Sequence, residues 1–119
     1  MWQLTETMLR DLGRWAESKQ GVEELWLFGS HARGDAGPYS DVDFAIALAP
    51  VGSGGDHALS TYFENAAGWQ RELWKIVGTE VSLEAIRPNT PADRRIRGEG
   101  RLLWKRAGKA GQDAGPDAA

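Results

Sequence analysis

The amino-acid sequence predicts an α/β fold in which a small β-sheet is flanked by α-helices. Apolar residues recur at helical spacing over residues 2–19 and again over 57–77, which is the pattern of helices with one buried face. Three short runs, at 25–28, 42–48 and 80–86, are apolar throughout or alternate between apolar and polar residues. Runs of that length and pattern are typical of β-strands. The chain therefore mixes helices with strands, as α/β domains do.

The first predicted helix and strand lead into a glycine turn. The apolar face of helix 2–19 carries Leu4, Met8, Leu12 and Trp15. The strand at 25–28 is apolar at every position, as expected of a strand that is buried on both faces. Gly29 closes this strand, and we expect a short helix to begin at Ser30, whose hydroxyl can cap the helix N-terminus.

The second predicted strand carries two aspartates. Residues 34–40 contain Gly, Asp, Pro and Tyr and predict a loop. Alternating apolar residues then predict a strand over 42–48. Because successive side chains of a strand point to opposite faces, Asp41 and Asp43 should lie on one face, about 7 Å apart. Helix 57–77 follows this strand.

The last part of the domain predicts a third strand and a closing helix. Alternation over 80–86 places three polar residues on one strand face, namely Glu80, Ser82 and Glu84. Thr90 then offers an N-cap residue, and Pro91 suits the first helical position. We therefore expect a last helix from Thr90 to about Lys105.

Composition limits the size of the protein and its partners. The 119 residues, 41% of them hydrophobic, suffice for one domain, expected over residues 1–107. Residues 108–119 are rich in Gly, Ala, Asp and Pro, and we expect them to form a disordered tail. A net charge of −3 argues against nucleic acid as the main partner, because nucleic acids attract basic surfaces. Without cysteines, a leader pattern or an apolar span, we expect a cytoplasmic protein that needs no membrane.

The Gly29-Ser30 turn and the aspartate pair together suggest phosphate chemistry. Two carboxylates on one strand face can share divalent cations, and Mg²⁺ commonly binds one or two carboxylates together with substrate phosphates. A glycine turn at a helix start allows close approach of phosphate, and Arg33 can add a guanidinium to the same anion. These parts suit metal-dependent nucleotidyl transfer from a nucleoside triphosphate.

The same residues resemble a known family. Gly29-Ser30, then ten residues, then Asp41-Val42-Asp43 is similar to the signature of the minimal nucleotidyltransferases, in the DNA polymerase beta superfamily. The resemblance implies a small mixed sheet with flanking helices. It also implies that Gly29 and Ser30 bind the triphosphate, that Asp41 and Asp43 ligate Mg²⁺, and that Arg33 lines the site.

This chain departs from the family at the third carboxylate. In the family, a third strand usually supplies an aspartate beside the first two, and the matching position here is Ser82. A serine hydroxyl carries no charge, so it neither attracts a cation strongly nor acts as a general base. Glu84 and Glu80 share its strand face, and either could replace the missing carboxylate. We expect Glu84 to serve as the third catalytic and metal-binding carboxylate, with Glu80 as the alternative.

The resemblance also suggests a partner. Many family members are antitoxins paired with a helical HEPN toxin, and some transfer AMP from ATP to a tyrosine of that toxin. We expect this activity here, with the alternative of a binding module that neutralises its partner by occlusion. Trp69 and Trp74 widen the apolar surface of the second long helix and could meet such a partner. His31 is interpreted as a local hydrogen-bonding side chain rather than a catalytic base.

Overall fold

The computed structural model describes residues 2–37, 39–49 and 55–107, with backbone only for 55–57. The expected tail at 108–119 lies outside this described part. The helices are α1 (Glu6–Glu17), α2 (Gly29–Arg33), α3 (Gly55–Val77) and α4 (Pro91–Glu99). The strands are β1 (Val22–Phe28), β2 (Val42–Leu48), β3 (Val81–Ile86) and β4 (Arg101–Lys105).

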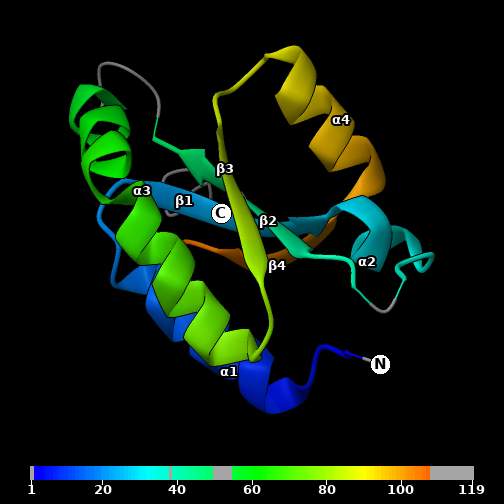
Figure 1. Ribbon diagram of the computed structural model, residues 1–119. Helices are drawn as coiled ribbons and strands as arrows, with labels where there is room; N and C mark the ends of the chain where they lie inside the picture. The colour runs from blue at the N-terminus through cyan, green and yellow to red at the C-terminus, as the bar shows by residue number, and fades with distance from the viewer. Residues whose placement is uncertain (1, 38, 50–54, 108–119) are drawn as a thin grey trace.

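The strands form one mixed sheet in the order β3-β2-β1-β4 (Figure 1). β1 runs antiparallel to both β2 and β4, whereas β2 and β3 are parallel. The predicted small mixed sheet with flanking helices is therefore confirmed. The register sets Asp43 of β2 beside Phe28, the last residue of β1, and beside Ser82 of β3.

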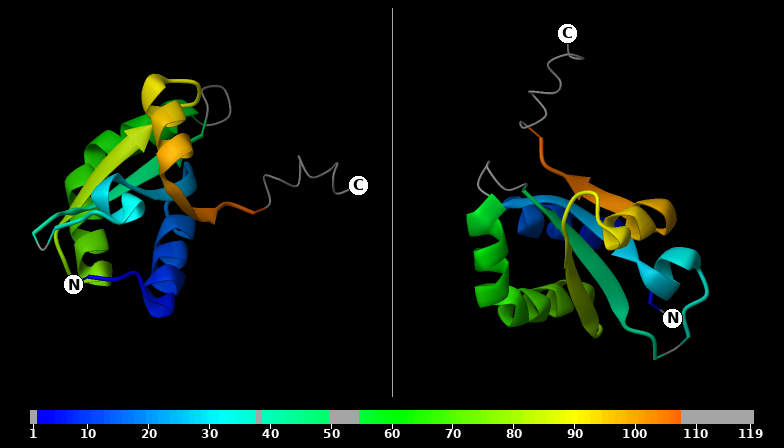
Figure 2. Two further views of the ribbon diagram at one scale, coloured as in Figure 1. Left: turned by 90° about the vertical axis from the view of Figure 1, so that its right-hand side faces the viewer. Right: turned by 90° about the horizontal axis from the view of Figure 1, so that it is seen from above.

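The two faces of the sheet have different cover. One face packs against α1 and α3 in the main core, where Leu25, Phe44 and Ile46 are fully buried among Leu12 and Leu73 of the helices. The other face is covered in part by α4, which Figure 2 shows lying across the sheet. Side chains alternate between these faces, so Asp43 and Ser82 lie on the second face, as Ala45 and Ile86 do. No helix in the described ranges is both long and apolar enough to cross a bilayer.

Two helix starts differ from the prediction. α1 begins at Glu6 rather than residue 2, because the Thr5 side chain accepts a hydrogen bond from Met8 N at 3.1 Å and caps the helix there. α2 begins at Gly29, and no side chain caps it. The prediction that Ser30 is the capping residue was wrong, because β1 runs into the helix without a linker and leaves Ser30 inside the first turn.

The predicted last helix is wrong in its second half. Thr90 caps α4 as expected, accepting from Asp93 N at 3.2 Å, but the helix ends at Glu99 and the chain turns into β4. A Cβ at Gly100 would lie 2.9 Å from Leu27 O and 2.6 Å from Ile96 O. The chain thus crosses close to β1 at Gly100, and the free edge of β1 then pairs with the following residues as a strand.

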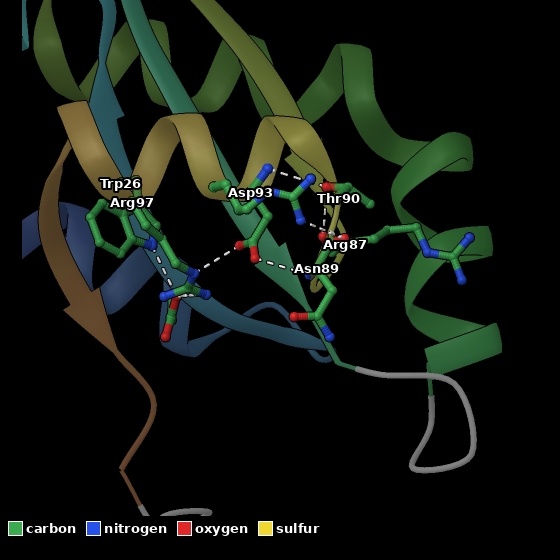
Figure 3. Close-up of polar contacts among 8 residues, drawn as sticks. Trp26, Arg87, Asn89, Thr90, Asp93 and Arg97 are labelled. Atoms are coloured by element: carbon green, nitrogen blue, oxygen red, sulfur yellow. Dashed lines mark hydrogen bonds and ion pairs between the residues drawn. The ribbon is translucent and has the colours of Figure 1, made fainter.

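An ion-pair network links α4 to β1 (Figure 3). Arg97 donates to Asp93 Oδ1 and to Glu24 Oε1, each at 2.8 Å, and its guanidinium lies 5.4 Å from the Trp26 ring centroid. Asn89 N also donates to Asp93. Burial alone would raise the pKa of Asp93, but the bonds from Asn89 and Arg97 outweigh it and lower that pKa. The network holds α4 over the face that carries Asp43.

Candidate active site

The site begins where the Asp43 carboxylate lies against the β1–α2 turn. Gly29 has a φ of +74°, and a Cβ built on it would collide with Asp43 Oδ2 and lie 3.0 Å from Asp43 Cγ. Glycine is needed here for two reasons. Other residues rarely adopt this backbone conformation, and any side chain would displace the carboxylate. The turn and the aspartate thus form one compact unit.

The aspartate pair concentrates negative charge that nearby side chains offset only in part. Asp41 is exposed directly before β2, and Asp43 is half-buried in the strand, on the other side of buried Val42. Burial and then the charge of Asp41 raise the pKa of Asp43, and this effect exceeds the opposite influence of His31 and Arg33. Within the described residues, no hydrogen bond or ion pair occupies either carboxylate.

These two aspartates fit a divalent cation by their chemistry. Carboxylate oxygens are the ligands that Mg²⁺ prefers, and a bound cation would relieve the repulsion that, after burial, contributes to the raised pKa of Asp43. The described residues contain no group of three or more acidic or histidine side chains placed to bind a metal. Further ligands would therefore come from substrate phosphates or water, as is common for Mg²⁺.

The two other predicted nucleotide-binding residues, Ser30 and Arg33, lie in α2. Ser30 is half-buried directly after Gly29. Arg33 is exposed, and its Nε is 3.3 Å from Asp35 Oδ2, in an ion pair whose two side chains are each at least half exposed. Such a pair is weakly held, so Arg33 is free to turn from Asp35 toward an anion at the site.

The register shows where the two candidates for a third carboxylate, Glu84 and Glu80, lie. Ser82 pairs directly with Asp43, and Glu84 pairs with Ala45, so Glu84 is one step, about 7 Å, further along the same face. The charge of Glu84 still contributes to the raised pKa values of Asp43 and Tyr62. Glu80 lies outside β3 and is exposed. Of the two glutamates, the structure thus brings Glu84 within electrostatic reach of Asp43.

The expected tryptophan surface is only half present. Trp69 is buried, with its ring 5.9 Å from that of Trp15 and nearly perpendicular to it, so the prediction that Trp69 faces a partner was wrong. Its apolar face closes the core between α1 and α3. Trp74 is 46% exposed and Phe63 is 70% exposed, so α3 does present large apolar side chains to solvent.

Sequence reasoning missed the role of Trp2. We expected it at the start of a helix, but it precedes α1, and its ring contacts that of His31 beside the site. Only its position three residues before Thr5, a residue suited to capping a helix N-terminus, could have suggested that it lies outside the helix. His31 does make the local hydrogen-bonding contact that was expected of it, with its Nε2 3.3 Å from Ser40 O.

A glycine turn at a helix start, packed against one of two neighbouring aspartates on a mixed sheet, is the arrangement expected of a nucleotidyltransferase. Residues 10–98 match the family described as Nucleotidyltransferase domain, and the chain belongs to that family. Curated proteins gave no match.

Solved structures share the fold at low sequence identity. A toxin–antitoxin structure with AMP-PNP superposes with a TM-score of 0.57 and 20% identity, over 97% of this chain and 85% of that one. A mutant of the toxin–antitoxin MntA-HpeT with two Asp-to-Glu changes gives 0.59 and 15%, over 92% and 83% of the two chains. A Tyr-to-Ala mutant of the same pair gives 0.57 and 21%, over 90% and 77%.

Proposed function

We propose that the protein transfers AMP from ATP to a hydroxyl group in a Mg²⁺-dependent reaction. The observation that carries this proposal is the Asp43 carboxylate held against the Gly29 turn, beside Asp41, with no hydrogen bond or ion pair to either aspartate among the described residues. Two unneutralised carboxylates next to a phosphate-accepting turn are suited to a nucleotide that arrives with its metal. Because ATP is the expected substrate, we also propose that the protein acts in the cytoplasm.

Each site residue has a distinct role in this proposal. Asp41 and Asp43 would hold Mg²⁺, which supplies charge stabilisation to the attacking and leaving oxygens. Gly29 and Ser30 would receive the triphosphate. Arg33 would leave its exposed pair with Asp35 to contact a phosphate.

Glu84 is our candidate for the third carboxylate. The acceptor oxygen would bond to the α-phosphorus as pyrophosphate leaves, and the hydroxyl proton would pass to a base. Glu84 stands on the same face as Ser82 and Asp43, within electrostatic reach of Asp43. In this proposal Glu84 therefore takes the catalytic and metal-binding part that the serine at position 82 cannot take.

As the acceptor we propose a tyrosine of a helical HEPN-type toxin, which makes this protein an antitoxin. Support comes from the fold shared with toxin–antitoxin structures, one of which is described with AMP-PNP. The exposed rings of Phe63 and Trp74 on α3 offer apolar area for a protein partner.

The test is transfer of label from ATP labelled at the α-phosphate to a helical protein encoded beside this chain's gene. Asp43→Asn keeps the shape of the side chain and removes its charge, so transfer should fall by at least a hundredfold. Asp11→Asn is the matched control, because it removes one carboxylate from α1, outside the site. Unchanged transfer by a folded Asp43→Asn protein would refute the proposal.

Ser82 favours a second candidate, a catalytically weakened antitoxin that inhibits its partner by occlusion. An uncharged residue stands directly beside Asp43, where family members usually have an aspartate. This candidate predicts that the double variant Asp41→Asn/Asp43→Asn still binds and inhibits the partner. Loss of inhibition with retained binding would exclude it.

A further inference from the structure

Trp2 anchors the N-terminal segment beside the candidate site. Its indole Nε1 donates to Val77 O, at the end of α3, at 2.9 Å. The indole also packs against the main core and meets the His31 ring edge to face, with centroids 5.0 Å apart and planes at 74°. Two segments far apart in sequence thus fix the position of the Trp2 ring, and that ring limits how His31 can turn.

His31 in turn contacts the peptide that carries Asp41. Its Nε2 lies 3.3 Å from Ser40 O, and because a carbonyl oxygen only accepts, this contact requires a hydrogen on Nε2. Ser40 also closes the end of the loop, since its Oγ accepts from Gly37 N at 2.9 Å and its own N donates to Gly37 O at 3.2 Å.

We propose that His31 is a positioning residue, which holds the Ser40–Asp41 peptide so that the Asp41 carboxylate faces Mg²⁺-ATP, and that Trp2 keeps the imidazole in place. This inference rests on the function proposed above. The Ser40 carbonyl and the Asp41 N–H belong to one planar peptide unit, so a contact to the carbonyl restrains the Asp41 backbone as well. Asp41 requires such a restraint because it is exposed and lies outside β2, so strand pairing does not hold its backbone.

A positioning role of His31 requires a hydrogen-bond donor near Ser40 O, whereas a purely packing role does not. His31→Gln can place an amide N–H near Ser40 O, whereas His31→Ala cannot. The loss of one hydrogen bond of this kind should weaken Mg²⁺-ATP binding roughly two- to tenfold. We expect His31→Gln to recover most of that binding.

The experiment has two readouts on the full-length protein. Without nucleotide, amide hydrogen exchange at Ser40, whose N–H donates to Gly37 O, should be faster in His31→Ala than in wild type, while exchange in β1 and β2 stays unchanged. With nucleotide, calorimetry should show the weaker Mg²⁺-ATP binding of His31→Ala. Trp2→Leu, which keeps apolar bulk but removes the ring contact, should change both readouts in the same direction by a smaller factor.

The outcomes separate this inference from the proposed function. If Asp43→Asn abolishes ATP binding but His31→Ala changes neither exchange nor affinity, the positioning role is refuted while the function stands. If Asp43→Asn binds like wild type, the proposed function fails first, whatever His31→Ala does. If His31→Gln is as impaired as His31→Ala, the donor to Ser40 O is not what matters, and the inference is wrong.

Discussion

Gly29 offers a sharp test of the contact between the turn and Asp43. Gly29→Ala has to hold a non-glycine residue at a φ of +74° and place its Cβ against the Asp43 carboxylate. Gly34→Ala is the matched control, because Gly34 has a φ of +86° and a Cβ there would meet nothing within 4 Å. Gly29 is the first residue of the short helix α2, and Gly34 follows its last residue.

The two substitutions should differ in cost. The backbone conformation alone costs about 1–2 kcal/mol for alanine, and both variants lose that much stability. At Gly29 the forced shift of Asp43 adds about 1–3 kcal/mol, as overpacking does in a filled site. We therefore expect Gly29→Ala to lose about 2–5 kcal/mol of unfolding free energy in urea titrations, and to lose ATP affinity with it.

A double variant isolates the Asp43 contribution. Asp43→Ala removes the two atoms closest to the new Cβ and leaves only the Cβ of residue 43, 3.3 Å away. Most of the added cost at Gly29 should therefore disappear when the two changes are combined, and the cost should approach that of Gly34→Ala. If Gly29→Ala alone is no more destabilising than Gly34→Ala, the close approach of Asp43 to the turn is refuted.

Three further predictions concern charge. Because the pKa of Asp43 is raised in the folded state, ionised Asp43 opposes folding at neutral pH, so Asp43→Asn should raise the thermal midpoint while it removes activity; a lower midpoint would contradict this. Arg97→Met removes the ion-pair partner of Asp93 and Glu24, whose side chains are only 10% and 12% exposed. Since Arg97 is 43% exposed, we expect a loss of about 2–3 kcal/mol in urea titrations, against about 0.5 kcal/mol or less for exposed Arg95→Met; equal losses would refute the network. The lowered pKa of Asp93 stabilises the fold above about pH 4, so that contribution should fade as pH drops further, and Asp93→Asn should flatten this acid limb of stability.

Local patterns predicted most of the sheet and the centre of the site. The alternation at 42–48 predicted β2 with its bounds unchanged, because each residue faces either the main core or α4. The chemistry of the Gly29-Ser30 turn and the aspartate pair, and the family resemblance that they carry, predicted one shared site, and in the structure Asp43 lies against Gly29. The register confirms that Ser82 stands beside Asp43.

Tertiary contacts explain what local patterns missed. Residues 101–105 have no strong local preference for a strand, and they form one because β1 has a free edge and Gly100 lets the chain approach it. The environment of Trp69 depends on Trp15, more than fifty residues earlier. Trp2 likewise finds its partners at Val77 and His31, which no local pattern could supply.

We propose above that Asp43 and the Gly29 turn form a working nucleotide site. Calorimetric titration with ATP, with and without Mg²⁺, tests it most directly on wild type, Asp43→Asn and the control Asp11→Asn. We expect Mg²⁺-dependent binding by wild type and Asp11→Asn, and none by Asp43→Asn. Equal binding by Asp43→Asn, or binding that ignores Mg²⁺ in all three proteins, would contradict it.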